Sequence, residues 1–180
     1  ADFFELDLRT SAGDVTPGER KEPPHLTTRV AILHYASPPT VGGVESTIAY
    51  HARGLADLGC AVRVVSGSGA PFDDRIETRI EPLFGSRHDA VLRVKVALDR
   101  GRVPDDFDAL TDQAAEMLRA CLEGCSVLIA HNVHTLHKNL ILTAALARLT
   151  AEGAPWHTIA WCHDLAWTNT QYQPELFDGY

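Results

Sequence analysis

The sequence lacks the features that mark membrane-spanning, nucleic-acid-binding and secreted proteins. No apolar run reaches the roughly 18 residues that a membrane-spanning helix needs, so no segment is expected to cross a bilayer. Basic residues are the minority, with 16 Lys and Arg against 24 Asp and Glu, and the net charge of −8 argues against general nucleic-acid binding. The opening ADFFELDLRTSAGD carries acids where a secretion signal has bases, and no basic membrane-binding patch is evident. A cytoplasmic location is therefore expected.

Cysteine is also scarce, and its spacing does not suggest a metal or disulfide framework. The four cysteines are Cys60, Cys121, Cys125 and Cys162. Three residues separate Cys121 from Cys125, whereas redox and zinc motifs use CxxC. We expect four buried free thiols, as in proteins of a reducing compartment.

The chain divides into an N-terminal arm and one domain. Residues 1–28 are rich in Gly, Pro and charge, which is typical of a linker or surface arm. Residues 29–180 are expected to form a single domain, since 45% of the sequence is apolar and 22% is charged.

From residue 29 onward, apolar runs of strand length alternate with segments of helical periodicity. Residues 29–35 and 60–67 are predicted strands, and the helix between them ends at Gly59. Its apolar stripe consists of Val44, Ile48, Ala52, Leu55 and Leu58. Further strands are predicted within 75–85, 126–132 and 156–164, and further helices at 88–100, 106–124 and 135–153. This alternation predicts an α/β fold with a mostly parallel sheet flanked by helices.

Polar residues gather where three of the predicted strands end. They are His34 and Tyr35 after the first strand, His131, Asn132 and His134 after the strand at 126–132, and His163, Asp164 and Trp167 after the last. Because ligands of open parallel sheets bind beyond the carboxyl ends of the strands, these residues predict a ligand site at one sheet edge.

The loop after the first strand ends in Gly42 and Gly43, directly before a predicted helix. Without Cβ atoms a ligand can approach this backbone closely, and the first N–H groups of the helix favour an anion such as a diphosphate. Equally, the glycines could only let the helix pack close to the strand. The loop matches neither GxGxxG nor the P-loop pattern.

Three segments together resemble the N-terminal half of retaining glycosyltransferases of the GT-B type, family 4. They are VAILHYASPPTVGGVESTIAYHARGLADLGCAVRVVSG, SVLIAHN and TIAWCHDLAW. They resemble that family's opening strand, Gly-Gly-Val-Glu helix and second strand, then its D-V-I-H-A-H strand, then its H-D strand end. The resemblance covers residues 29–168, is loose over 70–125, and is absent from 1–28.

The resemblance implies a Rossmann-like domain that forms one half of a GT-B architecture. Gly42 and Gly43 would lie against the donor diphosphate, with His163 near the transferred sugar and Asp164 shaping that pocket. Tyr35, His131 and Asn132 would line the acceptor side. From its place after the His-Asp pair, Trp167 could also stack on a sugar. The nucleotide-sugar is a substrate, and no separate cofactor is implied.

In that family a C-terminal domain holds the donor and carries a glutamate pair and basic phosphate-binding residues. This sequence contains no such domain, so we expect the chain to be inactive by itself. Two alternatives remain open. One is a metal-assisted hydrolase that uses His131, His134 and His163, although three-residue spacing across a strand end need not put these side chains on one face. The other is a non-catalytic binding module of the same fold.

Several residues near the predicted site also have structural interpretations. His34 is expected to be a structural histidine, and His51 to face solvent or pair locally. Trp161, within a predicted strand, is expected in the core. Glu45 could contact a ligand, but a carboxylate in the first turn of a helix is also favoured by the helix dipole.

Overall fold

The computed structural model describes residues 27–173 and residue 176. The predicted arm therefore lies almost wholly outside the described residues. The elements along the chain are β1 (Arg29–His34), α1 (Gly43–Asp57), β2 (Ala61–Ser66), β3 (Ile76–Ile80), the 3-10 helix η1 (Pro82–Phe84), α2 (Asp89–Leu98), α3 (Phe107–Cys121), β4 (Val127–His131), α4 (Leu140–Ala151) and β5 (His157–Trp161). Among the described residues, no helix is both long and apolar enough to cross a membrane.

The strands form one five-stranded parallel sheet in the order β3-β2-β1-β4-β5. This confirms the α/β class and the Rossmann-like arrangement. β1 lies at the centre, where Ile32 is in register with Val64 of β2 and Ile129 of β4. Because every strand runs the same way, all carboxyl ends lie at one edge of the sheet. The strand order changes direction between β1 and β4, which is where ligands of such sheets bind.

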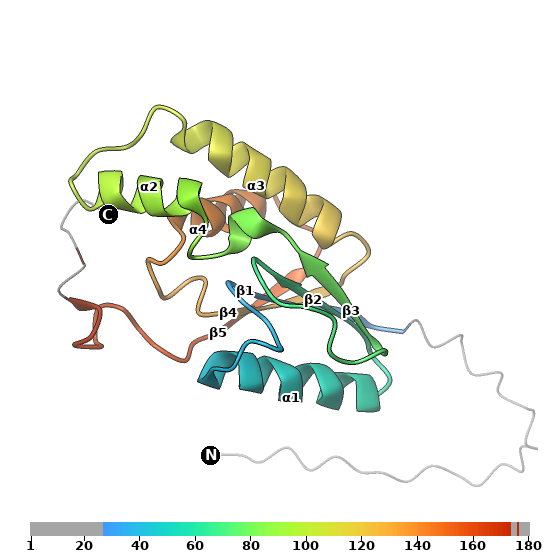
Figure 1. Cartoon of the computed structure of the whole chain (residues 1–180). Coiled ribbons are helices and arrows are strands. Elements are labelled where there is room, and N and C mark those ends of the chain that lie inside the picture. Colours follow the sequence, from blue (N-terminus) through green and yellow to red (C-terminus); the bar gives the residue numbers. More distant parts are fainter. Residues whose placement is uncertain (1–26, 174–175, 177–180) are drawn as a thin grey trace, which may run out of the picture.

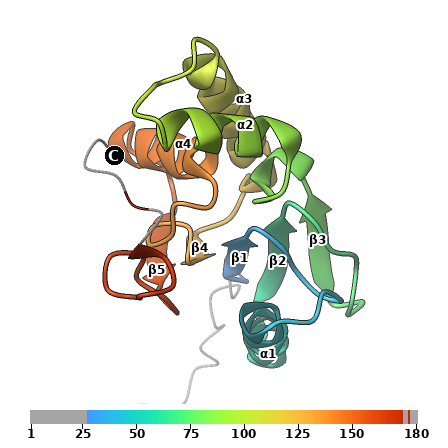
Figure 2. The same cartoon turned by 60° about the vertical axis from the view of Figure 1, so that its left-hand side comes forward.

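Helices cover the two faces of the sheet unequally. Figures 1 and 2 show α1 alone on one face and α2, α3 and α4 on the other. The larger core lies on the three-helix side and includes Leu33, Phe84, Leu118 and Leu146. The smaller core packs α1 against β1, β2 and β3.

The apolar stripe of α1 explains this second core. Ile48 and Ala52 are fully buried, and Val44 and Leu55 pack beside them. The expectation that Leu58 continues the stripe is wrong, because the helix ends at Asp57 and the Leu58 side chain is 82% exposed. Gly59 follows with φ of +84°, a left-handed conformation that favours glycine at a helix end.

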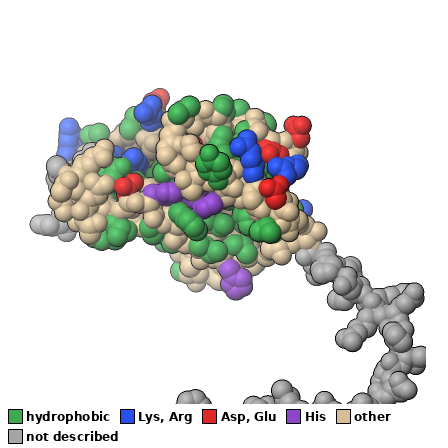
Figure 3. Space-filling model, turned by 90° about the horizontal axis from the view of Figure 1, so that it is seen from below, with side chains coloured by type: hydrophobic (Ala, Val, Ile, Leu, Met, Phe, Trp, Pro, Cys, Tyr) green, Lys and Arg blue, Asp and Glu red, His purple; other side chains and the backbone are tan. Residues whose placement is uncertain are grey.

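β5 is an edge strand, and its side chains are exposed on both faces. Trp161 was expected in the core but is 42% exposed, because no described helix covers β5 on the α1 side of the sheet (Figure 2). Seen from below, the molecule has apolar and histidine side chains together at its surface (Figure 3). Periodicity identifies a strand, but it does not show what covers that strand.

α4 begins later than the sequence suggested. Residues 132–139 form a loop, and Asn139 caps the helix by accepting a hydrogen bond from the Leu142 N–H at 3.0 Å. The Asn139 amide also donates to the Leu83 carbonyl at 2.9 Å. This buried asparagine thus ties the start of α4 to η1, and the loop after β4 stays at the sheet edge.

The four cysteines are free but not uniformly buried. Cys121 and Cys125 are buried, and burial raises the pKa of Cys121 to about 11. Cys60 is half-buried and Cys162 is exposed. The expectation of a buried thiol is therefore wrong for Cys162, which follows the uncovered strand β5.

Candidate functional site

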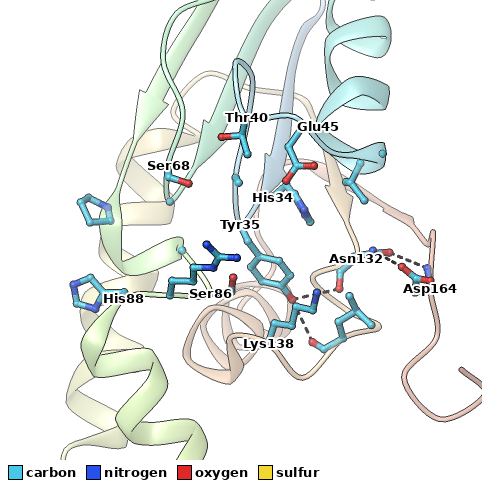
Figure 4. A pocket seen from close by; sticks show the side chains of 18 of the residues that line it. His34, Tyr35, Thr40, Glu45, Ser68, Ser86, His88, Asn132, Lys138 and Asp164 are labelled. Atoms are coloured by element: carbon cyan, nitrogen blue, oxygen red, sulfur yellow. Dashed lines mark hydrogen bonds between the residues drawn. The ribbon is translucent and has the colours of Figure 1, made fainter. Parts of the chain in front are cut away.

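A cleft of about 570 Å³ opens at the carboxyl edge of the sheet. It lies between the ends of β1 and β4, and Figure 4 shows it in close-up. Its size falls within the usual range for small-molecule sites. Its lining comes from the ends of β1, β2 and β4 and from the starts of α1 and α2. The lining residues include His34, Tyr35, Thr40, Gly43, Glu45, Gly67, Ser68, Gly85, Ser86, Arg87, His88, Asn132, Lys138, Asp164 and Tyr172.

β1 delivers His34 and Tyr35 to this cleft. His34 Nδ1 lies 2.7 Å from the His131 carbonyl oxygen, and since a carbonyl only accepts, this nitrogen carries the proton. Burial lowers the pKa of His34, so the ring is neutral and its Nε2 is a hydrogen-bond acceptor. The Tyr35 hydroxyl donates to the carbonyls of Asn132 and Leu136, at 3.4 and 3.2 Å, and burial raises its pKa. Both side chains thereby tie β1 to the loop after β4.

Asn132 holds the end of β5 against the end of β4. Its φ of +59° is left-handed, which asparagine tolerates better than most residues, and its N–H donates to the Trp161 carbonyl at 3.0 Å. Its Oδ1 accepts from the backbone N–H groups of His163 and Asp164, at 2.7 and 3.2 Å. Nδ2 donates to Asp164 Oδ2 at 3.5 Å. One buried amide therefore sets the position of the His-Asp pair.

Asp164 and Trp167 differ in their relation to the cleft. Asp164 lines it, and Oδ1 of its carboxylate accepts from Asn169 at 3.2 Å. Trp167 is 57% exposed and is not part of the lining. Any contact of Trp167 with an acceptor would therefore be made outside the cleft.

His131 and His163 are not part of the cleft lining. His131 is fully buried, and its Nδ1 is 2.9 Å from His163 Nε2. Its ring packs beside those of His51, Trp161 and His163. The proposed direct contact between His131 and an acceptor is thus not possible in this structure, because neighbouring rings enclose the imidazole. His51 was expected to face solvent or pair locally, and it is half-buried against the exposed Trp161.

The burial of His131 predicts acid sensitivity. Burial and the neighbouring imidazoles of His163, His51 and His34 lower its pKa from 6.5 to about 3. Between these pH values the unfolded chain binds a proton that the folded chain does not, so the free energy of unfolding falls as pH decreases. Urea denaturation at pH 7 and at pH 5 measures this loss in the free energy of unfolding. The loss should be smaller by about 1–2 kcal/mol in His131→Asn than in the wild type.

The control for this experiment is His157→Asn, which removes an exposed imidazole from β5. It should lose stability with acid as steeply as the wild type does. An equal fall in His131→Asn would show that this imidazole is not held neutral by the fold.

The two glycines before α1 differ in what they offer a ligand. Gly42 has an extended backbone, with φ of −173°, and the Glu45 carboxylate occupies the place where its Cβ would stand. Gly43 has no atom near its Cβ position and lines the cleft. The expectation that both glycines are open is therefore wrong for Gly42, since the carboxylate of Glu45 fills that space. Glu45 itself lies at the cleft wall, so its structural and ligand-contact interpretations both stand.

The histidines proposed for a metal site do not meet. His134 is exposed on the loop after β4 and shares no described contact with His131 or His163. Within residues 27–173 and 176, no group of three or more His, Cys, Asp or Glu side chains is arranged to hold a metal ion. The hydrolase alternative thus lacks a three-ligand site in this part of the chain.

The cleft also contains residues that the sequence did not point to. Ser68 follows β2, and Ser86, Arg87 and His88 connect η1 to α2, while Lys138 precedes α4. Extending the strand-end argument to β2 would have found Ser68. Arg87 and Lys138 carry no sequence signal, because they come from loops whose approach to the cleft depends on tertiary packing.

The fold and the site together define a Rossmann-like domain with a polar cleft at the carboxyl ends of its strands. A comparison of the chain with models of known protein families and with curated protein sequences gives no match.

Proposed function

We propose that the chain is the N-terminal, acceptor-side half of a retaining glycosyltransferase of the GT-B type, family 4. Such an enzyme moves a sugar from a nucleotide-sugar to an acceptor hydroxyl. One observation carries the proposal: the three segments that resemble the family meet at one sheet edge, where Gly43, Asn132 and Asp164 line a single cleft. We also infer a cytoplasmic location, where the free thiols would stay reduced.

In this proposal each lining residue has a role in binding or charge stabilisation. Gly43 and the first N–H groups of α1 face the donor diphosphate. Asp164 shapes the sugar pocket, and His163 lies beside it on the same strand end. Tyr35 and Asn132 form the acceptor wall. When the sugar–diphosphate bond breaks, its electron pair remains on the diphosphate, which accepts the proton of the attacking hydroxyl, and the sugar is transferred with retention. The domain contributes positioning and electrostatic stabilisation.

Glu45 should weaken donor binding in this arrangement. Its carboxylate lies in the first turn of α1, at the helix end that would face the diphosphate. We expect Glu45→Gln to bind UDP or GDP about 2–5 times more tightly at low salt, because removing a like charge there is worth about 0.3–1 kcal/mol. Isothermal titration of the two proteins measures this. Weaker binding by Glu45→Gln would instead assign Glu45 a direct contact with the ligand.

The proposal is tested by the selectivity of the 180-residue chain. It should bind UDP or GDP weakly but detectably, and bind uridine and guanosine much less, because the diphosphate is the group that meets α1. It should not turn over any nucleotide-sugar by itself. Turnover by this chain alone would refute the division of labour between two domains, and equal binding of nucleosides and nucleoside diphosphates would remove the role of α1.

A further inference from the structure

We propose that Arg87 and Lys138 form a subsite for a phosphate-type anion within the cleft. The acceptor in the proposed transfer is then a hydroxylated molecule that carries such a group. This second statement rests on the proposed function, whereas the subsite itself rests only on the cleft.

Two acidic and two basic side chains line the cleft, namely Glu45, Asp164, Arg87 and Lys138. Figure 4 shows Glu45 and Asp164 to the right of Tyr35, with Ser86 and His88 to its left and Lys138 below it. Arg87 lies between Ser86 and His88 in the sequence and lines the same cleft. Ser86 and His88, the sequence neighbours of Arg87, therefore lie on the side of Tyr35 away from the two carboxylates.

No ion pair joins the carboxylates of the cleft to its cations among the described residues. Asp164 accepts hydrogen bonds from Asn132 and Asn169, and Glu45 lies against Gly42. Neither Arg87 nor Lys138 forms an ion pair with a carboxylate among the described residues. In a chain of net charge −8, two cations in one cleft without a carboxylate partner favour an anionic ligand there.

Lys138 is held in place rather than extended into solvent. It is half-buried, and its ammonium group lies 5.1 Å from the centre of the Tyr172 ring. The side chain also lines the cleft that His34 and Tyr35 border. Lys138 therefore faces the interior of the cleft.

Further donors stand beside Arg87. His88 Nδ1 accepts from the Ala90 N–H at 3.3 Å, so in the neutral ring the proton is on Nε2, which is left to donate. Ser68 and Ser86 line the same cleft. A guanidinium fork, an ammonium group, an imidazole N–H and hydroxyl groups match the several oxygens of a phosphate monoester. The other lining residues include Tyr35, Thr40 and Asn132, whose hydroxyl and amide groups suit a polyol or sugar.

The test compares glucose 6-phosphate, inorganic phosphate and glucose as probes of the 180-residue chain, by isothermal titration at low salt. We expect glucose 6-phosphate to bind at least about tenfold more tightly than glucose, as charge-assisted hydrogen bonds imply. Arg87→Ala and Lys138→Ala should each remove most of this advantage. Arg102→Ala is the matched control, because it removes an exposed cation outside the cleft. Circular dichroism establishes that all three variants fold.

Three results would overturn the subsite: equal binding of the phosphate and the free sugar, unchanged binding by Arg87→Ala and Lys138→Ala, or an equal loss in Arg102→Ala. Titrating the same proteins with UDP and GDP separates this inference from the proposed function. If Arg87→Ala and Lys138→Ala lose UDP binding but keep glucose 6-phosphate binding, the cations serve the donor and the inference fails alone. If the wild type binds glucose 6-phosphate at these residues but no nucleoside diphosphate, the proposed function fails and the subsite stands.

Discussion

Replacing Gly67 with alanine should lower the free energy of unfolding by about 3 kcal/mol or more. A Cβ at this position would overlap the backbone N and Cα of Gly85 and lie 2.7 Å from the Phe84 carbonyl carbon. All of these are backbone atoms, so no side chain can rotate away. Gly67 also donates from its N–H to the Tyr35 carbonyl at 3.1 Å. Gly67 and Gly85 both line the cleft, so their close contact fixes this part of its wall.

Gly54→Ala provides the matched control for this prediction. Gly54 lies within α1, is exposed, and has no atom near its Cβ position. Alanine there should stabilise the chain by about 0.5–1 kcal/mol, since glycine is unfavourable inside a helix. Urea denaturation followed by circular dichroism gives both values. A Gly67→Ala protein within 1 kcal/mol of the wild type would show that the two backbones do not meet.

Asn132→Ala should lower the free energy of unfolding by about 3 kcal/mol. The variant loses the acceptor for the His163 and Asp164 N–H groups, which lie at 2.7 and 3.2 Å. It also places alanine at φ of +59°, where a Cβ is crowded by its own backbone. The end of β5 would then no longer be fixed, and His163 would lose its position on His131.

Two further variants separate the causes. Asn132→Gly relieves the backbone strain but restores no hydrogen bond, so it should be more stable than Asn132→Ala by about 1 kcal/mol. Asn132→Asp keeps an acceptor for both N–H groups but brings a second carboxylate to within about the 3.5 Å that now separates the Asn132 amide from Asp164. Its stability should therefore fall further at neutral pH than at low pH. If all three variants unfold like the wild type, Asn132 does not organise this edge.

Much of the fold could be predicted from the sequence because each strand is an apolar run that ends in polar residues. RVAILH and VLIAH become adjacent strands, β1 and β4, and their last residues meet at one edge, as parallel pairing requires. The helix after the glycine pair also follows from its stripe of apolar side chains. These features are local, and periodicity reports them directly.

Features that depend on neighbouring elements could not be predicted in this way. Trp161 has the sequence setting of a core residue, but no described helix covers its strand on that face. His131 ends β4 as His34 ends β1, and the register puts both on the same face of the sheet, yet His131 is enclosed by three other rings while His34 lines the cleft. Alternation of side chains along a strand decides which face a residue takes, but it does not say which side chains enclose the residue there.

Charged residues of the cleft show the same limit. Glu45 was seen as a helix-end carboxylate, but its position against Gly42 depends on its rotamer. Arg87 and Lys138 reach the cleft from two loops that lie 51 positions apart in the chain. Only the packing of α2 and α4 on the same face of the sheet brings these loops together (Figure 1).

The most direct test of the account is nuclear magnetic resonance titration of the isotope-labelled chain with UDP and GDP, using Gly43→Val and Gly54→Val. Both variants put the same side chain into α1 at an unobstructed glycine, and only Gly43 lines the cleft. The account predicts that the amide signals of Gly43 and Val44 shift in the wild type. It also predicts that binding survives in Gly54→Val and is lost in Gly43→Val while that variant remains folded. Undiminished binding by Gly43→Val, or shifts confined to residues outside the cleft, would contradict it.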